Sequence, residues 1–77
     1  MKNQRDTIRF KLLQNSLTQT WLINRLELYG VVTDKTELSS ALSGTRKGAK
    51  IEKIIQKSLE ILTEYEEKMA VYENTES

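Results

Sequence analysis

The chain contains no proline and only three glycines in 77 residues, and its apolar residues recur mostly at intervals of three and four. Proline breaks helices and glycine weakens them, so their scarcity permits long uninterrupted helices. Intervals of three and four place apolar side chains on one face of a helix, whereas strands need intervals of two. The pattern therefore predicts an all-α fold.

Capping residues divide this pattern into four main helices, which together predict a compact bundle with a long C-terminal helix. The first is expected from about residue 6 to 15, the second from 19 to 29, the third from 33 or 34 to 44, and the fourth from 49 to 72. The expected helix caps are Asp6, Thr18, Gly30, Asp34 and Gly44. The first helix should turn Ile8, Leu12 and Leu13 inward. The shared core is expected to contain Leu12, Leu22, Leu26, Leu38, Leu42, Ile51, Ile55 and Leu59.

A chain of this length forms one domain, here residues 1–77, with a core over about 6–62, a helical extension over 63–72 and a tail over 73–77. So small a core supplies little net stability, and we expect binding or self-association to add to it. Along the extension the apolar stripe continues through Tyr65, Met69 and Tyr72. These three residues either extend the core or form the interface of a homodimer, and we expect the interface.

Several classes of protein are excluded by composition. Without cysteine or histidine the chain cannot form disulfides, thiolate zinc sites or an imidazole base, and we expect no metal and no cofactor. No nucleophile–base pair, carboxylate dyad or phosphate-binding glycine loop can be assembled, so an enzyme is not expected. No apolar run approaches the ~20 residues that cross a bilayer, and the sequence predicts a cytoplasmic protein without a membrane partner.

Charge is distributed unevenly along the chain. Residues 1–50 carry nine basic and four acidic side chains, a net charge of +5, whereas residues 51–77 carry three basic and seven acidic ones, a net charge of −4. This asymmetry indicates a basic face suited to a polyanion. The alternative is two solvated faces of a small helical protein.

The third expected helix has an unusual surface. Only one narrow face is apolar, with Leu38 and Leu42 one turn apart and Ala41 beside them. The residues left to look outward are Lys35, Thr36, Ser39, Ser40 and Ser43. Serine and threonine are poor helix formers because their hydroxyls compete for backbone hydrogen bonds. Their presence indicates a requirement other than helix stability.

The stretches "SLTQTWLINRLELYG" and "TDKTELSSALSGTRKG", followed by an apolar helix, resemble the helix-turn-helix domain of the lambda Cro and phage-repressor (XRE-type) family over about residues 6–62. Thr18 and Gln19 match the hydroxyl residue and glutamine that open the family's second helix. Gly44, Arg46 and Lys47 match the glycine and basic residues after its recognition helix. The chain departs from the family pattern at Ile23, where alanine is frequent, and in a longer turn between the two helices.

This resemblance implies a small phage or prophage regulator whose third helix enters the major groove of an operator. The base contacts it implies are Lys35, Thr36, Ser39 and Ser40. The phosphate contacts it implies are Gln19, Thr20, Thr45, Arg46 and Lys47. It also implies a homodimer on a palindromic site.

Two functions remain open at this level. The first is a sequence-specific DNA-binding transcriptional regulator of Cro or repressor type, with double-stranded DNA as its partner. The alternative is an antirepressor-like modulator that keeps the fold but sequesters a phage repressor or another protein. Its net charge of only +1 is low for a dedicated DNA binder. For Lys35 through Ser40 the alternative is an ordinary solvated helix face. For Arg46, Lys47 and Lys50 it is a flexible loop followed by a capped helix. Trp21 is expected to be a packing residue.

Overall fold

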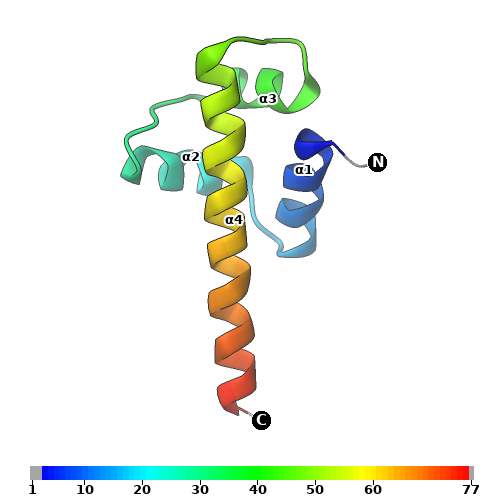
Figure 1. Ribbon diagram of the computed structural model, residues 1–77, viewed down its shortest axis with the longest axis vertical. Helices are drawn as coiled ribbons and strands as arrows, with labels where there is room; N and C mark the ends of the chain where they lie inside the picture. The colour runs from blue at the N-terminus through cyan, green and yellow to red at the C-terminus, as the bar shows by residue number, and fades with distance from the viewer. Residues whose placement is uncertain (1–2, 77) are drawn as a thin grey trace.

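A computed structural model describes the backbone of residues 3–76 and the side chains of residues 3–70. Within that part it contains helices only: α1 (Gln4–Gln14), α2 (Gln19–Leu28), α3 (Lys35–Ser43) and α4 (Ala49–Glu76). The predicted all-α fold with a long C-terminal helix is confirmed. Figure 1 shows α4 running the length of the molecule, with the three shorter helices gathered around its first half. No helix in the described residues is long and apolar enough to span a bilayer.

Helix α1 begins earlier than the sequence predicts. Its N-cap is Asn3, whose side-chain oxygen accepts a hydrogen bond from the Asp6 amide at 2.8 Å. The prediction of Asp6 as the cap is therefore wrong. Asp6 lies instead in the first turn, where a carboxylate is favourable at the positive end of the helix dipole.

The end of α1 is a left-handed turn made without glycine. Ser16 has a φ of +57°. Its amide donates to the Leu13 carbonyl at 3.1 Å, and the Leu17 amide donates to the Leu12 carbonyl at 2.8 Å. This pair of bonds is the Schellman motif, which satisfies carbonyls left unpaired at a helix end. Leu17, the next residue, packs against the core.

Both ends of α2 follow the predicted capping. The Thr18 hydroxyl accepts from the Trp21 amide at 3.1 Å, and Gly30 has a φ of +83°. The Val31 amide then donates to the Leu26 carbonyl at 2.9 Å, and Val31 is buried. A second Schellman motif thus ends α2 and directs the chain into the turn before α3.

Helix α3 is also capped as predicted, but its capping box is incomplete. The Asp34 carboxylate accepts from the Glu37 amide at 2.7 Å, and Gly44 closes the helix with a φ of +83°. The Glu37 carboxylate accepts from the Thr33 hydroxyl at 2.7 Å. Glu37 therefore ties the helix to the preceding turn through a side chain rather than through a backbone amide.

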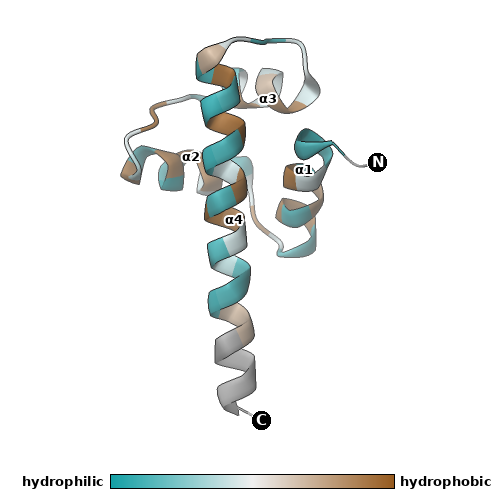
Figure 2. Ribbon diagram, viewed as in Figure 1, coloured by the Kyte–Doolittle hydropathy of each residue, from teal (hydrophilic) through white to brown (hydrophobic). Residues whose placement is uncertain are grey.

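All four helices contribute to one core. Its buried apolar residues are Ile8, Leu12, Leu22, Leu26, Val31, Leu38, Ala41, Leu42, Ile51, Ile54, Ile55, Ile61 and Leu62. The predicted core residues are all in this set except Leu59, which packs against the core from a partly buried position. The expectation that Leu13 faces inward is wrong: 81% of it is exposed, because Ile8 and Leu12 already occupy the inner face of α1. Figure 2 shows hydrophobic residues of α4 concentrated in the half that the shorter helices surround.

Polar and aromatic contacts hold the middle of α4 to the other helices. Glu66 accepts hydrogen bonds from Lys11 and from Asn15, the latter at 3.0 Å, so α1 is tied to α4 near its own carboxyl end. On α2, the Trp21 ring meets the Tyr65 ring edge-on with centroids 5.3 Å apart. Beyond these contacts α4 continues to Glu76.

Candidate nucleic-acid interface

One face of α3 is turned to solvent and consists of short polar side chains. Lys35, Thr36, Ser39 and Ser43 are exposed, and Ser40 is partly buried. The opposite face is anchored by Leu38, Ala41 and Leu42, whose exposed fractions do not exceed 2%. The helix is thus fixed on the body of the protein by its apolar face, while Lys35, Thr36, Ser39 and Ser43 face solvent. Of the exposed hydroxyls, that of Ser43 donates to the Ser40 carbonyl at 3.2 Å.

The single acidic residue of α3 is held away from this face. The Glu37 carboxylate accepts from the Thr33 hydroxyl and lies 3.1 Å from the Lys50 ammonium group. Hydrogen bonds from Thr33 first and Lys50 second lower the pKa of Glu37, because they favour its ionised form. Lys50 itself keeps 59% of its side chain exposed in this pair.

A hydrogen bond joins the start of α2 to the middle of α3. The Ser39 hydroxyl donates to the Gln19 side-chain oxygen at 2.8 Å. The family resemblance predicts different contacts for these two residues, bases for Ser39 and phosphate for Gln19. The structure brings them together on one surface, with the exposed Thr20 next in the chain.

The amino end of α2 is electrostatically suited to an anion. Its first turn contains no acidic residue. Most helices gain stability from a carboxylate at that position, because the helix dipole is positive there. The Thr18 hydroxyl caps the Trp21 amide there, and no carboxylate of the first turn competes with an anion from outside the helix.

The segment after α3 presents two cations. Thr45, Arg46 and Lys47 are all exposed. The Ser40 carbonyl accepts from the Thr45 amide at 3.1 Å and from the Arg46 amide at 3.4 Å, so the start of the segment is bound to the helix end. The Ser43 hydroxyl lies 3.0 Å from that of Thr45. The backbone of Thr45 and Arg46 is therefore held at the end of α3, and Lys47 follows directly.

Two residues near α3 have no role assigned from the sequence. Ser43 belongs to the exposed face. Its place there could be predicted from the sequence, since it lies four residues after Ser39 and seven after Thr36. Arg5 reaches from α1 and donates from Nε to the Ala41 carbonyl at 2.8 Å. No local pattern indicates that contact, because 36 residues separate the partners.

The residues predicted to form a dimer interface do not share one environment. Tyr65 is partly buried and contacts Trp21, which confirms Trp21 as a packing residue. Met69 is 42% exposed. The side chain of Tyr72 lies outside the described residues. Tyr65 thus packs against α2 through Trp21, while Met69 presents more exposed apolar surface.

Among the described side chains there is no group of three or more histidine, cysteine, aspartate or glutamate residues that could hold a metal ion. Comparison of the chain with protein-family models, with curated proteins and with solved structures finds no match.

Proposed function

We propose that this protein is a sequence-specific DNA-binding transcriptional regulator of Cro or phage-repressor type, which places α3 in the major groove of an operator. The hydrogen bond between Ser39 and Gln19 carries the proposal. It joins the exposed face of α3 and the positive end of α2 in one continuous surface. A base-reading helix needs such a neighbour to hold the phosphate backbone beside it.

The side chains of α3 fit base edges. The major groove is about 12 Å wide and admits a helix. Short side chains such as Thr36, Ser39 and Ser43 let the helix backbone approach, and their hydroxyls both donate and accept hydrogen bonds. Lys35, at the start of the helix, adds a cation for guanine or for phosphate.

Phosphate contacts come from both sides of this helix. Arg46 and Lys47 follow its carboxyl end, and Gln19 and Thr20 open α2. Cations and helix amino ends bind phosphate irrespective of sequence, so these residues set the position of the protein on the duplex. The two groups flank α3 and would fix it in the groove between them.

A homodimer completes the proposal. Two copies related by a two-fold axis would place their α3 helices in successive major grooves, about 34 Å apart, and would read a palindrome. Met69, with its partial exposure, lies on the part of α4 that extends past the contacts with α1. This part of α4 is our proposed subunit interface.

The test is a selection from random-sequence duplex DNA, followed by affinity measurements on the enriched site. Wild type should enrich an inverted repeat. Ser39→Ala and Thr36→Ala should each weaken binding to that site by about 1–3 kcal/mol, with a much smaller loss on random DNA. Thr63→Ala, on the exposed side of α4, is the matched control and should bind like wild type.

Absence of any enriched sequence, with weak binding unaffected by the α3 substitutions, would contradict DNA recognition. That outcome would favour the protein-binding modulator instead. No contact in the described residues gives the modulator independent support, so the DNA-binding proposal is the one we develop.

A further inference from the structure

A cation outside the predicted contact set lies at the carboxyl end of α3. Arg5 extends from α1, and its Nε donates to the Ala41 carbonyl at 2.8 Å. A Cβ atom placed on Gly44 would lie 3.7 Å from this nitrogen. The guanidinium group is therefore held directly beside the glycine that begins the segment carrying Arg46 and Lys47.

Most of this guanidinium group is unused. It has five N–H donors, and the bond to Ala41 takes one. Within the described part of the chain, the two terminal nitrogens of Arg5 make no hydrogen bond or ion pair. Arg5 is nevertheless partly buried, so its position is restricted. A fixed cation with free donors is prepared for an anion that arrives from outside.

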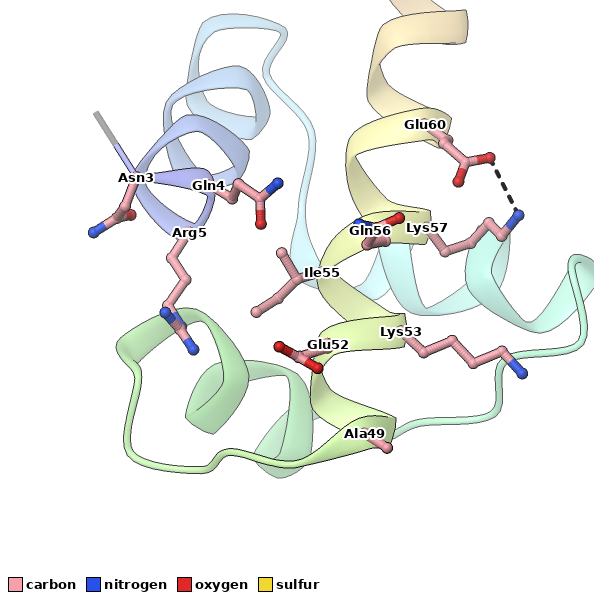
Figure 3. A pocket seen from close by; sticks show the side chains of 10 residues that line it. All are labelled: Asn3, Gln4, Arg5, Ala49, Glu52, Lys53, Ile55, Gln56, Lys57 and Glu60. Atoms are coloured by element: carbon pink, nitrogen blue, oxygen red, sulfur yellow. Dashed lines mark hydrogen bonds and ion pairs between the residues drawn. The ribbon is translucent and has the colours of Figure 1, made fainter. Parts of the chain in front are cut away.

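A groove beside Arg5 offers one place for such an anion. It has a volume of about 740 Å³ and lies between α1 and the first turns of α4. Figure 3 shows Arg5 pointing from α1 toward the end of α3, with Glu52 on the α4 side of the groove. Glu60 also lines it, as do Lys53 and Lys57. Because this lining carries both signs of charge, the groove itself does not select an anion.

The side of Arg5 that faces Gly44 and the segment after it is more favourable for an anion. There the exposed Arg46 and Lys47 follow Gly44 by two and three residues, and they line a shallow hollow together with Lys50 and Glu37. We propose that Arg5 is a further phosphate-contacting residue of the DNA interface, contributed by α1. The inference rests on the proposed function and adds a third element to the surface. Arginine suits the task, since its planar end can bind two phosphate oxygens at once.

The experiment is a salt titration of binding to a random-sequence duplex. Removing one phosphate contact should lower the slope of log affinity against log salt by about 0.9. Arg5→Met should show this lower slope, as should Arg46→Ala. Arg9→Met removes the same charge from the same helix, but Arg9 is exposed and pairs with Asp6, so its slope should equal that of wild type. Arg5→Lys keeps the charge and should retain most of the slope.

The outcomes separate this inference from the proposed function. If wild type binds with a slope that Arg46→Ala lowers and Arg5→Met does not, Arg5 is only a structural link and the inference is wrong. If wild type does not bind DNA, the proposed function itself fails. If Arg5→Met does not fold, NMR of the arginine side chains in the wild-type protein tests whether Arg5 contacts DNA. Added duplex should shift the Arg5 Nε signal, and a shift at Arg46 alone would overturn the inference.

Discussion

Ser16 carries the turn that ends α1 in a conformation better suited to glycine. Its φ of +57° costs a residue with a side chain about 1–2 kcal/mol. We predict that Ser16→Gly raises the free energy of unfolding by about 1 kcal/mol, measured by urea denaturation. Gln14→Gly, two residues earlier and still helical, is the control and should lower it by up to about 1 kcal/mol. Equal destabilisation by both changes would contradict this account.

Ser58 places a hydroxyl in the core. It is fully buried on α4, and its oxygen has no hydrogen-bond partner among the described residues. A buried polar group without a partner lowers stability. Ser58→Ala should therefore raise the free energy of unfolding by about 1 kcal/mol, whereas Leu62→Ala, one turn further along the same face, should lower it by about 2–5 kcal/mol. A marked loss of stability in Ser58→Ala would show that the hydroxyl is bonded.

At the scale of single residues, the sequence predicts the features that depend on residues nearby in the chain. The caps Thr18, Asp34 and Gly44 follow from local chemistry and were correctly predicted. The predicted start of α1 was wrong because Asn3 and Asp6, three residues apart, are both good N-caps. Which of them caps the helix depends on how many residues pack against the rest of the protein. Arg5 could not be found at all, since its partner Ala41 is distant in sequence.

The link between α1 and α4 should make stability depend on pH. Hydrogen bonds from Lys11 first and Asn15 second lower the pKa of Glu66 below its ordinary value of 4.5. The unfolded chain therefore binds a proton at a higher pH than the folded one. The link contributes fully above that ordinary value and is lost as pH falls through the lowered pKa.

We therefore predict that Glu66→Gln is less stable than wild type at pH 7 and that the difference narrows below pH ~4.5. Urea denaturation at several pH values measures it. Glu67→Gln changes the same charge at an exposed neighbouring position, and should follow the wild-type curve. If the difference in free energy of unfolding between Glu66→Gln and wild type stays constant across the acid range, the charge of the Glu66 carboxylate does not contribute to stability.

The second half of α4 is the element that we propose as the subunit interface. Met69 is 42% exposed, so Met69→Lys should leave the folded monomer nearly unchanged in stability. If this face joins two copies, the substitution should weaken the dimer, as sedimentation equilibrium would measure. Glu67→Lys, also exposed, introduces the same side chain beside it as a control. Wild-type protein that is monomeric at high micromolar concentration would contradict the interface.

For the whole molecule, the periodicity of the sequence was sufficient to predict the fold. Four amphipathic segments and a lack of proline leave few arrangements other than a helical bundle. The site was predictable in part. The exposed face of α3 follows from Leu38 and Leu42 pointing inward, because a helix has only one opposite face. The contact between Ser39 and Gln19 depends on how α2 and α3 pack together, which periodicity does not determine.

The central claim is that α3 lies in a DNA groove, and the absence of cysteine from the chain permits a direct measurement. A cleavage reagent such as an iron chelate can be attached at one introduced cysteine, Ser43→Cys at the exposed end of α3, with the protein bound to its selected duplex. The account predicts cuts confined to a few base pairs of each half-site. Thr63→Cys, exposed on α4, should give none there. Cuts of equal strength from both positions, or none from Ser43→Cys despite bound DNA, would contradict the claim.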